Sequence, residues 1–175
     1  MAHKIVKTIF IMTVLATMGY AQKLSFPAEK PSLSVEFPKG WSVEIDQNAV
    51  SGVIAMSEDS AVEIDIWMID PKKVEKDPDK AIDAAIDEIA ELVEEHIKNF
   101  KVIEQANGEI GGFKYVSIEG IGEDTKNGGK LQIYAEIFTP NDKEIFIMLY
   151  WASKDAEDKN IKDIDFIFDS VSKID

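Results

Sequence analysis

The chain has 175 residues, of which thirty-three are acidic and nineteen basic, so its formal net charge at neutral pH is −14. Such a charge disfavours nucleic acid and anionic lipid as partners. All basic residues are lysines and there is no cysteine, which excludes arginine-based phosphate sites, disulfides, thiol nucleophiles and zinc–thiolate sites.

The first twenty-one residues have the pattern of a secretory signal peptide. Lys4 and Lys7 give a positive start, residues 9–18 are mostly apolar, and Gly19-Tyr20-Ala21 supplies small residues before a cleavage site. The apolar run is about half of the roughly 20 residues that a spanning helix needs, which disfavours the alternative of an uncleaved membrane anchor. We therefore expect a periplasmic or secreted protein with no membrane span after cleavage.

The rest of the chain is expected to form a single domain. Residues 22–32, with two prolines, are predicted to be an extended N-terminal arm, and residues 33–175 to be the domain itself. A chain of this size buries enough surface to be stabilised by core packing alone.

Alternating apolar and polar residues predict strands at the start of the domain. Residues 33–37 and 41–45 alternate on either side of Pro38-Lys39-Gly40, which predicts a β-hairpin with Trp41 closing one end of the sheet. Residues 61–69 alternate as well, and their partly polar face carries Glu63, Asp65 and Trp67.

Two amphipathic helices are predicted. Asp77-Pro78 is typical of a helix start, and the first helix is expected over residues 78–99, with Ile89 and Val93 in its apolar stripe. The second is expected over residues 157–172, with Ile164 and Phe168 in its stripe.

Between the helices, strand patterns occur near residues 101–106, 113–122, 130–139 and 144–153. Turns are predicted at Asn107-Gly108, Asn127-Gly128-Gly129 and Pro140-Asn141-Asp142. The last strand is apolar on both faces, so it needs cover on both sides, and its Trp151 is expected in the core. We therefore predict an α+β fold: a three-layer α-β-α sandwich with a predominantly antiparallel sheet.

This order of elements resembles the PsbP-like superfamily, which contains photosystem II extrinsic proteins, Mog-type Ran-binding proteins and bacterial DcrB proteins. The resemblance covers most of the chain after the leader and implies a sandwich used as a binding or assembly module. It is carried by Phe37-Pro38-Lys39-Gly40-Trp41, the strand Val62-Glu63-Ile64-Asp65-Ile66, the helix after Pro78, and the late strands before a C-terminal helix.

Few residues suggest catalysis. His96 is the one histidine after the leader, and it is expected to be structural or solvated because no cysteine or second histidine accompanies it. Glu63 and Asp65 lie about 7 Å apart on one strand face, a pair that a carboxylate-based hydrolase would use, but a solvated strand face is the better explanation, because a chain with this many acidic residues contains such pairs by chance. We expect no catalytic residue and no cofactor.

Calcium is the metal that this composition favours, because calcium prefers oxygen ligands. Residues 123–128 place a glycine sixth, as a calcium-binding loop does, but Tyr134 stands where the bidentate glutamate belongs. A hairpin loop is the expected structure there, and Asp163, Asp165 and Asp169 are expected on a solvated helix face.

Trp67, with Glu63 and Asp65 on the same strand face, is the candidate contact with a partner. We predict a non-enzymatic binding or assembly module that acts through a protein or envelope partner. The alternatives are a carboxylate-based hydrolase, a calcium-dependent envelope protein and a purely structural envelope subunit.

Processing of the leader gives the first testable prediction. Expressed in a bacterium with its leader, the protein should appear outside the cytoplasm with Gln22 as its first residue, within a residue or two. N-terminal sequencing of the exported protein checks this, and finding Met1 or Ala2 would contradict it.

Overall fold

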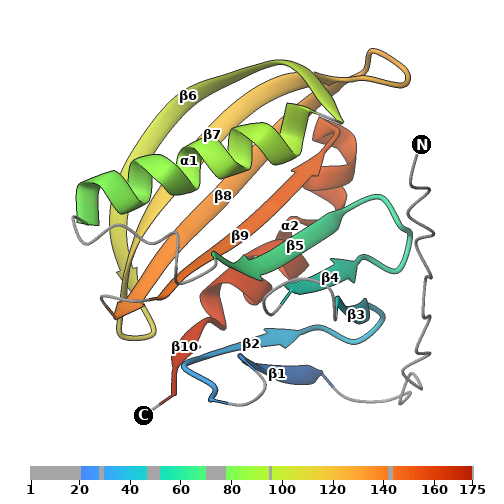
Figure 1. Ribbon diagram of the computed structural model, residues 1–175. Helices are drawn as coiled ribbons and strands as arrows, with labels where there is room; N and C mark the ends of the chain where they lie inside the picture. The colour runs from blue at the N-terminus through green and yellow to red at the C-terminus, as the bar shows by residue number, and fades with distance from the viewer. Residues whose placement is uncertain are drawn as a thin grey trace, which may run out of the picture.

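The computed structural model describes residues 21–27, 30–46, 52–69, 78–94, 96–141 and 144–174. A larger antiparallel sheet has the strand order β3-β4-β5-β9-β8-β7-β6, and a smaller one the order β1-β2-β10 (Figure 1). The described elements are β1 (Gln22–Phe26), β2 (Leu33–Phe37), β3 (Ser42–Asp46), β4 (Gly52–Met56), β5 (Glu63–Met68), α1 (Pro78–Glu94), β6 (Ile97–Ile110), β7 (Phe113–Asp124), β8 (Lys130–Asn141), β9 (Glu144–Ala152), α2 (Lys154–Asp169) and β10 (Ser172–Lys173).

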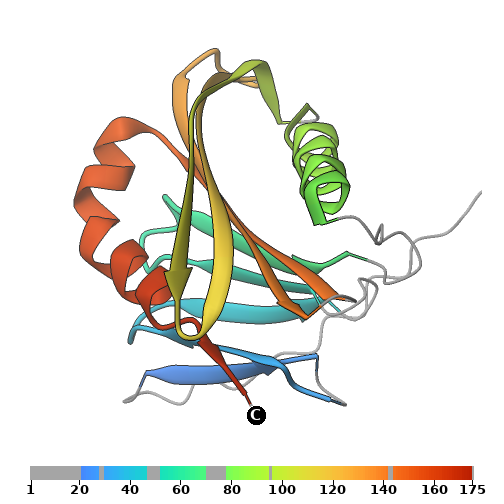
Figure 2. The same ribbon diagram turned by 90° about the vertical axis from the view of Figure 1, so that its left-hand side faces the viewer.

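The two helices lie on opposite sides of the larger sheet, as Figure 2 shows. Ile89 and Val93 of α1 are buried in one core cluster, which includes Ile147 and Leu149 of β9. On the other face α2 and the smaller sheet share a second cluster with β9, and its members include Phe146, Met148, Tyr150, Ile164 and Phe168. The predicted three-layer α-β-α sandwich is confirmed.

The predicted hairpin of residues 33–45 is wrong. β2 pairs with β1 and β10 in the smaller sheet, whereas β3 pairs with β4 in the larger one. The turn at residues 38–40, with Gly40 at a φ of 98°, carries the chain from one sheet to the other. Alternation shows that a segment is a strand but not which strand it pairs with, so the change of sheet was not visible in the sequence.

The segment predicted as an extended arm contains a strand. Its residues 22–26 form β1, and Phe26 is 5% exposed in the core. The predicted leader, residues 1–21, lies outside the described residues except for Ala21.

The first helix is shorter than predicted. α1 ends at Glu94, and the chain enters β6 at Ile97, so Asn99 and Phe100 are strand residues. Asn99 has a φ of 56°, a left-handed conformation that asparagine tolerates. The position of Phe100 fits the helical spacing of the apolar residues in α1, and Phe100 packs against the same core cluster as α1. It reaches that cluster from β6, however, and not from the helix. The predicted cap Asp77 lies outside the described residues.

One predicted turn is misplaced. β6 continues through Asn107-Gly108, and the chain turns at Gly111-Gly112, which have φ values of 55° and 85°. Gly108 lies opposite Tyr115 of β7, whose ring occupies the space that a Cβ at this position would need. The turn predicted at residues 127–129 is confirmed, and of Pro140-Asn141-Asp142 the last residue lies outside the described residues.

The second helix starts and ends three residues earlier than predicted, at Lys154 and Asp169. Ser153 caps it, because its hydroxyl accepts a hydrogen bond of 3.3 Å from the backbone N–H of Ala156. At the other end the Ser170 hydroxyl accepts from the backbone N–H of Glu36 at 2.8 Å, which ties the end of α2 to β2 just before the chain enters β10 at Ser172.

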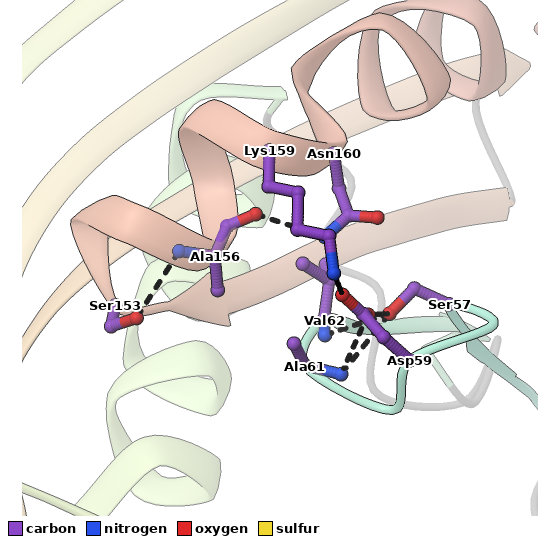
Figure 3. A network of polar contacts seen from close by, with 8 residues as sticks. All are labelled: Ser57, Asp59, Ala61, Val62, Ser153, Ala156, Lys159 and Asn160. Atoms are coloured by element: carbon purple, nitrogen blue, oxygen red, sulfur yellow. Dashed lines mark hydrogen bonds and ion pairs between the residues drawn. The ribbon is translucent and has the colours of Figure 1, made fainter.

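Polar contacts fix α2 on one side of the sheet. Lys159 binds Asp59 in the turn between β4 and β5 at 2.6 Å, and the Ser57 hydroxyl and the Ala61 N–H also donate to Asp59 (Figure 3). The Lys159 ammonium and these donors hold the pKa of the Asp59 carboxyl well below its usual range. Trp41, which was expected to close a hairpin, is buried and donates from Nε1 to Asp163 of α2 at 3.1 Å.

Core packing gives the second prediction. Ile89 on α1 is 1% exposed and Ile167 on α2 is 0% exposed, in separate clusters on the two faces. Replacing either with alanine should lower the free energy of unfolding by about 2–5 kcal/mol, because each leaves a cavity. Glu91→Ala, on the exposed side of α1, is the control and should change it by less than about 0.5 kcal/mol. Urea denaturation measures all three; an unchanged midpoint for either isoleucine variant would contradict the three-layer packing.

Candidate functional site

A cleft of about 520 Å³ lies between α2 and the β6–β9 part of the larger sheet. The bonds of Lys159 to Asp59, of Asp163 to Trp41 and of Ser170 to Glu36 hold α2 towards β2, β4 and β5. The helix therefore does not fully cover β7 and β8, and the cleft lies there. Ile161 of α2 is 38% exposed and borders the cleft. The volume falls within the range of about 300–1,000 Å³ that is usual for small-molecule sites.

The register of the strands places polar and aromatic side chains in rows across the floor of the cleft. Glu119 of β7, Tyr134 of β8 and Tyr150 of β9 are paired neighbours. In the next row Glu136 of β8 pairs with Ser117 of β7. Alternation along β8 turns Tyr134 and Glu136 towards α2, while Ile133, Ala135 and Ile137 pack under α1.

Three aromatic rings meet beside this floor. The ring centroids of Tyr134 and Phe168 are 5.3 Å apart and those of Tyr150 and Phe168 are 5.9 Å apart, both in edge-to-face geometry. Tyr150 donates its hydroxyl to Glu157 of α2 at 2.8 Å. Burial raises the pKa of both tyrosines above the usual range, so their hydroxyls stay protonated and donate.

Glu136 is the unusual residue of the cleft. It is 4% exposed; its Oε1 accepts a hydrogen bond of 2.7 Å from the Tyr134 hydroxyl, and its Oε2 is buried with no partner among the described residues. Burial raises the pKa of Glu136 to about 7, and the negative charge of Asp169 adds to the rise, while the Tyr134 hydrogen bond opposes it. An unsatisfied buried carboxyl oxygen costs about 1–3 kcal/mol or more.

The walls and rim of the cleft are acidic. Glu119, Glu157, Asp165 and Asp169 line it together with Glu136. Lys154, the one cation among the described lining residues, is paired with Glu157 at 3.0 Å and with Asp158 at 2.8 Å. The cleft therefore carries a clear excess of negative charge, and Asp165 and Asp169, expected on a solvated helix face, are exposed at its rim.

The residues predicted to contact a partner lie on the other face of the sheet. Trp67 is partly buried and donates from Nε1 to Glu88 of α1 at 3.2 Å. Asp65 has a buried Oδ1 without a partner among the described residues, and burial, with the charge of Glu63, raises its pKa to about 7. Contact of Glu63, Asp65 and Trp67 with a partner stays a prediction.

His96 follows α1 and stacks on Trp151, with ring centroids 5.8 Å apart and an angle of 14° between the planes. His96 is exposed, and Trp151, which was expected in the core, is only partly buried beneath it. The structure brings no second histidine or cysteine to this pair within its described part.

The loop considered for calcium is a hairpin loop, as predicted. The Asp124 carboxylate accepts from the backbone N–H of Lys126 at 2.6 Å and from the Asn127 side chain at 3.0 Å, so it stabilises the turn itself. No group of three or more histidine, aspartate or glutamate side chains suited to a metal ion occurs within the described residues. In that same part of the chain neither helix is long and apolar enough to cross a bilayer.

Sequence reasoning missed Glu136, Tyr134 and Tyr150. The available signal was one glutamate in the middle of residues 133–138, where every neighbour is apolar or aromatic. A charge at the centre of a covered strand is rare enough to mark a candidate site.

The comparisons with solved structures decide the fold. The solution structure of cyanobacterial PsbP (CyanoP) from Synechocystis sp. PCC 6803 matches with a TM-score of 0.65 and 15% identity over 93% of this chain and 98% of that one. The fold is PsbP-like. No protein-family model and no curated protein sequence matches the chain.

Two further structures share this fold. LpqN of Mycobacterium tuberculosis, involved in cell envelope biogenesis, matches with a TM-score of 0.54 and 15% identity over 90% of this chain and 93% of that one. A Bacteroides thetaiotaomicron protein matches with a TM-score of 0.59 and 12% identity over 90% of this chain but 50% of its own length. At these identities the likeness concerns the fold alone.

The buried carboxyl gives the third prediction. Because the pKa of Glu136 rises from 4.5 to about 7 on folding, the folded protein keeps a proton that the unfolded chain releases between these values. Glu136 therefore lowers the free energy of unfolding as the pH rises through this window. In Glu136→Gln that loss should disappear, so the variant should gain up to about 3 kcal/mol over the wild type between pH 4.5 and 8.

Urea denaturation across this pH range measures the difference between the two proteins. Glu109→Gln, at an exposed position of β6, is the control and should show no such pH-dependent gain. A constant difference between Glu136→Gln and the wild type would show that folding does not raise the pKa of Glu136, and it would contradict the prediction.

Proposed function

We propose that the protein is a non-enzymatic binding module that acts outside the cytoplasm through a protein or envelope partner, and that the cleft beneath α2 is its binding site. The observation that supports this most is Glu136, a residue of the cleft lining whose buried Oε2 has no partner among the described residues. An apolar residue at this position would give a more stable core, so the carboxyl is better explained by what it binds.

The extracytoplasmic location rests on the leader pattern of residues 1–21. LpqN, which shares the fold, is involved in cell envelope biogenesis. The same setting is part of the proposal for this protein.

A carboxylate-based hydrolase is the second candidate, and one observation favours it. A glutamate with a pKa of about 7 beside further carboxylates has the protonation state that a general acid needs. However, Glu136 is 4% exposed and its Oε1 already accepts the Tyr134 hydrogen bond. Proton transfer to a scissile bond needs direct hydrogen-bond contact with the leaving atom, whereas the attraction of a cation by the carboxylate does not. Binding is the function that this geometry supports better.

Capture of a partner gives the fourth prediction. The exported protein, immobilised and mixed with envelope extract, should retain a partner, and Ile161→Lys should reduce that retention about tenfold or more because it places a bulky charge at the cleft. Phe166→Lys is the matched control, since Phe166 is also an exposed apolar residue of α2, at 43%, but lies beside Lys23 and Glu36 away from the cleft.

A third variant, Glu63→Lys, tests the partner contact predicted for Glu63, Asp65 and Trp67. Loss of the partner with Glu63→Lys but not with Ile161→Lys would move the binding site to the α1 face. Quantitative mass spectrometry of the retained proteins distinguishes these outcomes, and retention of nothing above the level of an inert acidic protein would refute the proposed function.

A further inference from the structure

We propose that the cleft beneath α2 binds a small organic ammonium ion, with the Glu136 carboxylate as its counter-ion and the rings of Tyr134, Tyr150 and Phe168 around its alkyl groups. This inference rests on the proposed function, because it names the ligand class of the same cleft.

The charge of the ligand follows from Glu136. Its Oε1 is occupied by the Tyr134 hydroxyl, whereas its Oε2 is buried and has no partner in the described part of the chain, and Glu136 is one of the residues that line the cleft. Lys154 cannot serve as the partner, because Glu157 and Asp158 hold its ammonium group at 3.0 and 2.8 Å. A buried carboxylate is stabilised when a cation or a strong donor pairs with it, and a cationic ligand in the cleft would supply that pair.

The organic nature of the ligand follows from the aromatic walls. Tyr134, Tyr150 and Phe168 line the cleft and lie within 5.9 Å of one another, centroid to centroid. Ring faces attract alkylammonium groups through their quadrupoles, and they offer no ligand to a metal ion, which prefers oxygen atoms. The described carboxylates do not gather into a metal-binding group.

The rim of the cleft supports the same ligand class. Glu119, Asp165 and Asp169 add negative charge around the opening, which concentrates cations and repels anions. A neutral ligand of the same shape fits into the volume of about 520 Å³ equally well but leaves the Glu136 carboxyl unpaired. The chemistry of the cleft therefore selects for positive charge combined with apolar surface.

Calorimetric titration tests the inference. The exported wild-type protein is titrated at pH 8 and low salt with choline and with n-butylammonium, and in parallel with 3,3-dimethylbutan-1-ol, the neutral analogue of choline, and with butyrate. We expect saturable binding of the two cations and at least about tenfold weaker binding of the alcohol and the anion. Saturable binding of the alcohol or of butyrate with equal affinity would overturn the proposal, as would displacement of choline by Ca²⁺ at equal concentration.

Two variants assign the site. Glu136→Gln keeps the shape of the side chain and should weaken binding of both cations about tenfold or more, while Phe168→Leu should weaken choline binding several-fold. Glu109→Gln removes one carboxylate of the exposed β6 surface and should leave the affinity unchanged. Circular dichroism establishes that each variant is folded, and equal affinity of folded Glu136→Gln and wild type would overturn the proposal.

Further measurements distinguish a lipid headgroup from a free ion as the source of the ammonium group. They also test the ligand class separately from the proposed binding function. Sedimentation with phosphatidylcholine vesicles that depends on Glu136 assigns the ligand to a lipid headgroup, whereas binding of choline without sedimentation assigns it to a free ion. If no ammonium ion binds although Ile161→Lys abolishes partner capture, the ligand class is wrong and the binding function stands. If choline binds and no partner is captured, the ligand class stands and action through a partner is wrong.

Discussion

The structure depends on one constraint: β9 is apolar on both faces and lies at the centre of the seven-stranded sheet. Phe146, Met148 and Tyr150 face α2, while Ile147 and Leu149 face α1, so neither helix is dispensable. Each helix has one apolar side and is marginal in isolation, which means that helix and strand stabilise each other. The three layers therefore depend on one another, because both helices are needed to bury the two apolar faces of β9.

The cleft is a by-product of how that burial is completed. α2 covers β9 with Ile164 and Phe168, and the smaller sheet covers the neighbouring part of the same face. The contacts of Lys159 with Asp59 and of Trp41 with Asp163 all lie on the β2–β5 side of the helix. Because one helix cannot cover seven strands, the floor formed by β7 and β8 is left partly open, and this is where the polar rows of the sheet lie.

The architecture could be predicted from the sequence and the cleft could not. Periodicity located the strands and helices because it reports burial, and it placed Ile89 and Phe168 correctly in the core. It failed where several partners satisfy the same pattern: β2 alternates equally well in either sheet, and Phe100 packs into the α1 cluster from a strand. Glu136 and Tyr150 lie 14 positions apart and meet at one site through the register of β8 and β9, which composition does not encode.

The surroundings of a buried carboxyl distinguish the two faces of the sheet. Asp65 on the α1 face also has a raised pKa of about 7 and an unpartnered oxygen, but it is not among the residues that line the cleft beneath α2. Glu136 pairs the same electrostatic cost with a cleft, three rings and an acidic rim. A stable fold has no need of that combination, because Glu136 weakens folding as the pH rises towards neutral. A ligand that supplies positive charge offsets this penalty, so occupancy of the cleft and stability of the α2 layer should be thermodynamically linked.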